Sequence, residues 1–135
     1  MPHKLILRRA RALIGTPFRL HGRDPATGLD CVGMVAHVCG VRTAPTGYAL
    51  RGGSAESWSA LLNQFARKRQ RGPARPGNIL LIEAGPVQFH LGIWTGSSLI
   101  HADAHLRRTV ETPGPILWPI RGCWFAPKGN TSWQR

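Results

Sequence analysis

Cysteine and histidine residues are the side chains of this chain with the clearest capacity for chemistry. The 135 residues include three cysteines, Cys31, Cys39 and Cys123, and six histidines. An odd number of cysteines without a CxxC pair argues against a disulfide framework and favours reduced thiols. Cys39 and Cys123 lie among apolar or aromatic residues, which is typical of thiols that pack as small hydrophobic groups. A nucleophilic thiol with a histidine as its base is the chemistry that remains to be tested for Cys31.

Cys31 lies where a thiol can be made reactive. It directly follows Asp30, and an apolar run over residues 32–38 ends at Cys39 and Gly40. Because aspartate is a favoured N-cap and glycine a favoured helix end, this run predicts a buried helix that begins at Cys31. The positive end of a helix favours the thiolate, the form that attacks an acyl carbon.

Residues 89–103 supply candidate bases if they fold as a β-hairpin. With a two-residue turn at positions 96–97, one face of this hairpin is wholly apolar and belongs in the core. On the opposite face, His90 and His101 become diagonal neighbours about 7–8 Å apart at the backbone, so their side chains can meet. The apolar face consists of two residues from each strand, Leu91, Ile93, Ile100 and Ala102.

His90 is the candidate general base for Cys31. His101 is the candidate that orients the His90 ring, and Asp103, directly across the hairpin from His90, is the alternative. His105 is followed closely by two arginines and is predicted to be exposed. Period-two spacing of these side chains on one strand forms a poor cage for zinc, so neither a metal nor another cofactor is expected.

Helices are expected before strands. Amphipathic spacing predicts a helix over residues 3–14, and after a polar loop at residues 16–28 the Cys31 helix follows. A third helix is predicted to begin at Ser54, and its C-terminal end has no sharp boundary before the basic run at residues 67–71. Alternating runs then predict strands at residues 79–82, 89–95, 99–102, 107–110 and 116–125. This order predicts an α+β fold, with N-terminal helices packed on an antiparallel sheet, in one domain over residues 1–127 and a tail over residues 128–135.

The charge of the chain is strongly positive. Its 18 lysines and arginines exceed its 6 acidic residues by 12, so the surface should attract polyanions such as nucleic acid, lipid headgroups or envelope polymers, although a solvated basic face is the alternative. No helix-turn-helix, zinc-knuckle or RNP-like pattern is present, which argues against specific nucleic-acid binding. The apolar run at residues 5–7 is too short for a signal peptide or a membrane span. We therefore expect the chain to be made and kept in the cytoplasm unless something else carries it out.

Three segments resemble the NlpC/P60 family of cysteine peptidases. GTPF at residues 15–18 followed by GLDCVGMV at residues 28–35 resembles the nucleophile segment of that family. PGNILL at residues 76–81 resembles the strand ahead of the family's histidine, and HLGIW at residues 90–94 with LIHA at residues 99–102 resembles its HxGIY and IHA segments. Order and spacing match over about residues 13–110. The resemblance implies a papain-like fold, a triad of Cys31, His90 and His101, and hydrolysis of peptide bonds in peptidoglycan stems.

Two departures from the family pattern refine this expectation. Val32, where secreted wall enzymes usually have serine, and the loop at residues 21–23 look like the short versions encoded in phage and gene-transfer-agent tail modules. The resemblance thus implies tail-tip or hub partners and a place in a virion, which would bring the chain to the wall from outside.

Phe18 stands where the family commonly has a tyrosine whose hydroxyl is thought to lie near the nucleophile. The oxyanion would then depend on backbone amides, with His21 as a substitute, and a weak or inactive structural tail component is the alternative function. The candidate residues around the substrate and the oxyanion are Phe18, His21, Asp30 and Asp103.

Overall fold

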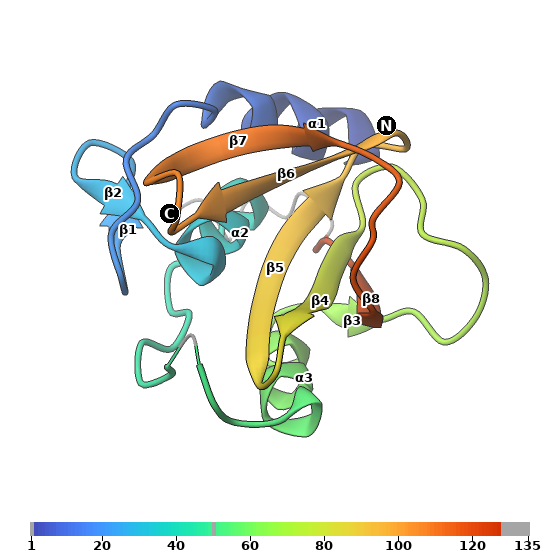
Figure 1. Cartoon of the computed structure of the whole chain (residues 1–135). Coiled ribbons are helices and arrows are strands. Elements are labelled where there is room, and N and C mark those ends of the chain that lie inside the picture. The colour runs from blue at the N-terminus through green and yellow to red at the C-terminus, as the bar shows by residue number, and fades with distance from the viewer. Residues whose placement is uncertain (1, 50, 128–135) are drawn as a thin grey trace.

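The structure is a computed structural model that describes residues 2–49 and 51–127 (Figure 1). The predicted tail at residues 128–135 lies outside the described residues. The described part forms three helices, α1 (Pro2–Ala12), α2 (Cys31–Cys39) and α3 (Ala55–Asn63). All three lie on the same side of a large sheet, behind it in the view of Figure 1.

The sheet is antiparallel throughout, in the order β3-β8-β4-β5-β6-β7. A small hairpin of β1 (Arg23–Asp24) and β2 (Gly28–Leu29) precedes α2. Helices on one face of an antiparallel sheet are the α+β arrangement, so the predicted fold class is confirmed. The strands of the large sheet are β3 (Arg67–Lys68), β4 (Ile79–Gly85), β5 (Gln88–Trp94), β6 (Ser98–Asp103), β7 (Arg108–Pro113) and β8 (Ile120–Phe125).

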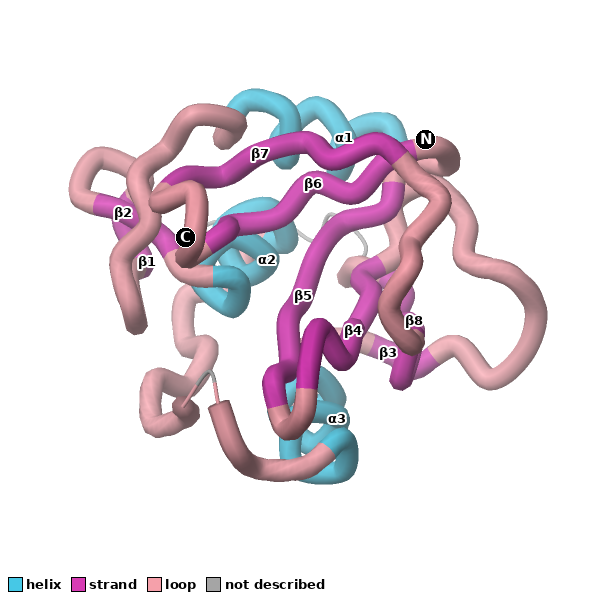
Figure 2. Tube along the Cα trace, viewed as in Figure 1, coloured by secondary structure: helices cyan, strands magenta, loops and turns pink. Residues whose placement is uncertain are grey.

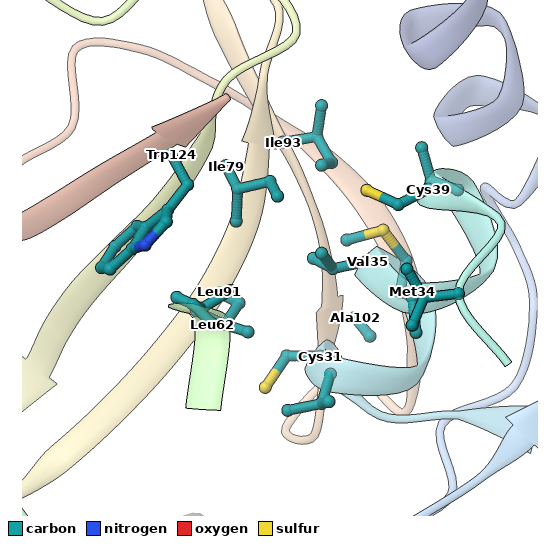
Figure 3. Close-up of a cluster of buried hydrophobic side chains, with 14 of the residues drawn as sticks. Cys31, Met34, Val35, Cys39, Leu62, Ile79, Leu91, Ile93, Ala102 and Trp124 are labelled. Atoms are coloured by element: carbon teal, nitrogen blue, oxygen red, sulfur yellow. The ribbon is translucent and has the colours of Figure 1, made fainter. Parts of the chain in front are cut away.

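The main core lies between the helices and this sheet. Figure 3 shows Met34 and Val35 of α2 facing Ile79 and Ile93 of the sheet, with Cys31 and Cys39 at opposite ends of the helix. Burial of each large aliphatic side chain contributes about 1.5–3 kcal/mol to the stability of this interface. The four residues of the predicted apolar hairpin face, Leu91, Ile93, Ile100 and Ala102, are fully buried.

The cap and the end of α2 are as predicted. Asp30 adopts an extended conformation, and its side chain accepts a hydrogen bond from the Gly33 amide at 2.8 Å. Gly40 ends the helix with a φ of 72°, the left-handed conformation that glycine adopts without strain. These two residues fix where the Cys31 helix begins and ends.

The register of the β5–β6 hairpin is also as predicted. Ile93 pairs with Ile100 and Trp94 with Leu99, and the Thr95 amide donates to the Ser98 carbonyl at 2.9 Å. Beyond these pairs the two strands diverge toward their other ends (Figure 1). The divergence leaves room at the level of the histidines.

Among the predicted boundaries that differ from the structure, two have a clear physical reason. Arg67–Lys68 is an edge strand rather than the end of the third helix, because it pairs with β8 and its cations lie over aromatic rings, with the Arg67 guanidinium 4.5 Å from the centre of the Phe125 ring. Residues 116–119 form a loop rather than the start of a strand, since prolines at positions 115 and 119 lack the N–H that a ladder needs. Figure 2 shows this loop and the longer loop segments at residues 41–49, 51–54 and 69–78. None of the described helices combines the length and apolarity needed to cross a bilayer.

Candidate active site

One pocket brings together the residues that the sequence singled out for chemistry. Cys31, His90 and His101 all line a cavity of about 360 Å³, together with Phe18, Asp103 and Trp118. The side chains come from the start of α2, from the diverging halves of β5 and β6, and from loops. The size of the cavity is in the range of single small-ligand sites.

The two histidines are in direct contact. Nε2 of His90 and Nδ1 of His101 share a hydrogen bond of 2.7 Å, and the rings meet edge to face at 84°. On its other side, Nε2 of His101 is 2.8 Å from Oγ1 of Thr112 on β7. Strands β5, β6 and β7 thus hold one continuous chain of hydrogen bonds. The sequence pattern did not indicate its last member, Thr112.

Asp103 is engaged differently. Its Oδ1 accepts hydrogen bonds from the backbone amides of His105 at 2.8 Å and Leu106 at 3.1 Å, which closes the turn after β6. Burial lowers the pKa of both His90 and His101, and the charge of Asp103 offsets part of this lowering. His101, not Asp103, is therefore the residue that contacts His90. Asp103 acts on the two histidines through its charge.

Cys31 and His90 line this pocket from different elements, the start of α2 and strand β5. Backbone groups of Leu91, the residue after His90, and of Val32 and Cys31 itself lower the pKa of the thiol. The Cys31 side chain is fully buried between helix and sheet. A sulfur and an imidazole that are far apart in the sequence therefore face the same pocket.

Burial keeps the resting thiol neutral. The pKa of Cys31 is raised to about 12, because loss of solvation and then the Asp30 charge raise it by more than the three backbone groups lower it. The helix start alone would favour the thiolate, and that expectation is overturned because desolvation and a neighbouring carboxylate outweigh these backbone groups. Rapid alkylation at neutral pH is consequently not expected of Cys31, whether or not it is a nucleophile.

Burial also keeps the histidines neutral. Desolvation lowers the pKa of His90 to about 4, and the charge that His101 would carry lowers it as well. The pKa of His101 is lowered by the same desolvation. At neutral pH the pocket thus holds a thiol and two uncharged imidazoles.

The hydrogen-bond chain leaves one nitrogen free to act as a base. Because Nε2 of His90 is bonded to His101, Nδ1 is the ring nitrogen left for a proton from the thiol. Nδ1 can accept that proton only when Nε2 carries hydrogen, which requires Nδ1 of His101 to be the acceptor and Nε2 of His101 to donate to Thr112. The Thr112 hydroxyl can act as this acceptor, so the observed contacts are compatible with this tautomer.

A buried network around Asp30 anchors the helix that carries Cys31. Besides capping α2, the fully buried Asp30 carboxylate accepts hydrogen bonds from Nη1 of Arg23 at 3.1 Å, the amide of His21 at 2.8 Å and the hydroxyl of Tyr48 at 2.5 Å. The Tyr48 hydroxyl also accepts from Nη2 of Arg23 at 2.9 Å. Burial and the bond to Asp30 raise the pKa of Tyr48. Its loop has no local periodicity, so sequence reasoning missed this residue, although it is the chain's one tyrosine.

The remaining candidates divide between the pocket and this network. Phe18 lines the pocket with a ring that has no hydroxyl. His21 is not brought to the pocket: its Nε2 is bonded to the Tyr48 carbonyl at 2.7 Å, and its ring contacts the Tyr48 ring. Asp30 is likewise occupied by its four donors. This leaves backbone amides near Cys31 as the candidate donors to an oxyanion.

Within residues 2–49 and 51–127, no group of three or more histidine, cysteine or acidic side chains is arranged to hold a metal ion.

Comparison with known proteins bears on the fold. No family model and no curated protein matches the chain. The NlpC/P60 domain of the peptidoglycan hydrolase SagA matches with a TM-score of 0.55 and 27% identity, over 84% of this chain and 90% of that domain. NlpC1 from Trichomonas vaginalis matches with a TM-score of 0.67 and 13% identity over 92% of this chain, which spans 44% of that protein.

A third match shows that the fold can exist without catalysis. RipD from Mycobacterium tuberculosis is described as a non-catalytic NlpC/P60 domain protein adapted to peptidoglycan binding, and it matches with a TM-score of 0.55 and 14% identity over 92% of this chain and 96% of that one. At this identity the likeness concerns the fold alone, as it does for NlpC1. The chain therefore has the fold of NlpC/P60 domains, and the match to the SagA domain agrees with the resemblance of the segments around Cys31 and the two histidines.

Proposed function

We propose that this domain is a cysteine peptidase that hydrolyses peptide bonds in the stem peptides of peptidoglycan. The observation that carries the proposal is the 2.7 Å bond between His90 and His101 on the wall of the pocket that also contains the Cys31 thiol. A base with a second group to orient it, next to a nucleophile, is the arrangement that acyl transfer requires. The peptidoglycan substrate is inferred from the hydrolase SagA, whose domain is similar to this chain.

The proposed reaction begins from neutral groups. As the Cys31 sulfur attacks the scissile carbonyl, its proton moves to Nδ1 of His90, and backbone amides at the start of α2 stabilise the oxyanion. The protonated His90 then gives this proton to the leaving amine, and a thioester to Cys31 remains. Water, deprotonated by His90, attacks the thioester and releases the carboxylic acid and the free thiol. His101 holds the His90 ring throughout.

A non-catalytic, wall-binding domain is the second candidate function. Phe18 provides no hydroxyl at the pocket, and burial raises the pKa of the Cys31 thiol to about 12. RipD shows that an NlpC/P60 domain can bind peptidoglycan without cleaving it. This candidate predicts binding to wall material that does not depend on Cys31.

Cys31→Ala separates the two candidates. Digestion of purified peptidoglycan, followed by mass spectrometry of the released fragments, should show new peptide termini with wild type and a loss of at least about 1,000-fold with Cys31→Ala. Cys39→Ala is the matched control, because Cys39 is a buried cysteine at the other end of the same helix, and it should retain activity. Equal release of fragments by wild type and Cys31→Ala would contradict the peptidase proposal. If both proteins nevertheless bound wall material equally well, the second candidate would be favoured.

We further propose, from the sequence resemblance, that the chain is carried by a phage-like tail tip and contacts hub proteins there. Support would come from finding the chain in purified tail particles by mass spectrometry. Its presence in cell extract but not in the particles would reject this location.

A further inference from the structure

The pocket that contains Cys31 has an exposed aromatic wall that the proposed chemistry does not use. Trp118 lines the pocket and is 51% exposed, and its neighbour Leu117 is 86% exposed. Both lie on the loop between β7 and β8. Large apolar side chains exposed side by side at a pocket commonly mark a contact with a ligand or a partner.

This exposure does not result from a loose loop. The Gly114 amide donates to the Ser97 carbonyl at 2.8 Å, and the Glu83 amide donates to the Pro119 carbonyl at 2.9 Å, so each end of the loop is tied to the sheet. Ile116 packs against the small apolar cluster of Leu80, Ile82 and Leu99 on the face of the sheet away from the helices. The indole is thus presented to the pocket by a loop that is anchored on both sides.

The chemistry of the proposed substrate narrows what the indole can contact. Stem peptides consist mainly of small and charged residues and offer no large apolar side chain to pack on an exposed indole. The amino sugars to which the stems are attached do offer an apolar surface, because the C–H groups of one pyranose face point the same way. These polarised C–H groups are attracted to the electron-rich face of an aromatic ring, and the indole N–H can donate to a sugar oxygen.

We propose that Trp118 forms a subsite for an amino-sugar ring of peptidoglycan at the edge of the Cys31 pocket. The proposal rests on the proposed function and specifies its substrate: a stem peptide still joined to the glycan, not a free peptide. Because Trp118 and Cys31 line the same small cavity, one ligand of this kind can occupy both. Phe18 and Phe89, which also line the pocket, give it two further aromatic rings.

Binding is tested without catalysis. In a Cys31→Ala background, titration with the disaccharide of N-acetylglucosamine and N-acetylmuramic acid should shift one indole N–H resonance, identified as that of Trp118 by its absence in Trp118→Phe. Trp118→Ala should weaken this binding by about tenfold or more, whereas Trp118→Phe should retain most of it. Leu117→Ala is the matched control, since Leu117 is more exposed but does not line the pocket, and it should bind like the parent.

Cleavage then tests the subsite against the peptidase proposal. Trp118→Ala should raise KM by about tenfold for a muropeptide that carries the disaccharide and leave KM unchanged for the same peptide without sugar. Disaccharide binding without any cleavage by wild type would reject the peptidase and retain the subsite. Cleavage in which Trp118→Ala affects both substrates equally would overturn the subsite alone. The absence of a shift in the Trp118 resonance would also overturn the subsite. Self-association that Trp118→Ala abolishes would overturn it as well, because the indole would then be a contact between two copies of the chain.

Discussion

The proposed role of His90 as a base depends on residues other than Cys31. His101 occupies Nε2 of His90, and Thr112 occupies Nε2 of His101 at 2.8 Å. Each link determines which nitrogen carries hydrogen on the ring before it. If the Thr112 hydroxyl donated instead of accepting, the proton would lie on Nδ1 of His90, which could not then accept one from Cys31.

Thr112→Val should therefore lower kcat by about tenfold or more, because it leaves the Nε2–H of His101 without an acceptor while keeping the β-branched shape of the side chain. Thr112→Ser restores the hydroxyl and should restore kcat. Nitrogen-15 chemical shifts of the two imidazoles report the tautomers directly, and a merely structural role for Thr112 would not change them. An unchanged tautomer in Thr112→Val would contradict the proposed selection.

At the scale of elements, α2 lies unusually close to the loop before it. A Cβ on Gly33 would lie 2.0 Å from the carbonyl oxygen of Gly22, and one on Gly22 would lie 2.1 Å from the carbonyl oxygen of Gly28. This close approach lets Arg23 reach Asp30 and places the helix start at the pocket. The glycine at position 33, part of the segment that resembles the NlpC/P60 nucleophile motif, is thus required by packing.

Gly33→Ala should destabilise the fold by about 2 kcal/mol or more, since backbone on both sides of the contact must move. Gly47→Ala is the control, because a Cβ there meets nothing within 4 Å, and it should change the free energy of unfolding by less than about 0.5 kcal/mol. Urea denaturation of the two variants measures the difference. Equal stabilities would show that the loop and helix can separate freely.

At the scale of the whole molecule, burial of the histidine pair makes stability depend on pH. In the unfolded chain each histidine titrates near its ordinary pKa of about 6.5, whereas folding lowers the pKa of His90 to about 4 and lowers that of His101. Between these values the unfolded state binds more protons than the folded state. Stability contributed by the neutral pair is therefore complete above about pH 6.5 and is lost as the pH falls toward 4.

The temperature at the midpoint of thermal unfolding should accordingly decrease as the pH is lowered from 7 to 4.5. His90 should account for at most about 3 kcal/mol of the lost free energy of unfolding. His90→Gln removes its titration, so the decline should be shallower in this variant over the same range. Identical slopes for wild type and His90→Gln would contradict the burial of a neutral His90.

Local rules were sufficient to predict α2, the hairpin and the pairing of the histidines. Asp30 and Gly40 bound a helix through their own backbone conformations, and strand alternation with a two-residue turn sorts residues 89–103 into an apolar face and a histidine face. These features depend on neighbours in sequence, so the candidate nucleophile and base could be named from sequence alone. The sequence alone does not decide which side chain bonds to His90, because the predicted hairpin register allows both His101 and Asp103.

Tertiary structure decided the rest, because it depends on contacts between distant segments and on the summed burial of the whole chain. Tyr48 reaches Asp30, Thr112 reaches His101 and Trp118 reaches the pocket from loops or strands that no local pattern connects to them. The pKa of Cys31 shows the limit most directly. A helix start predicts a lowered pKa, but the desolvation that raises it arises from everything packed around the sulfur, and no short stretch of sequence contains that information.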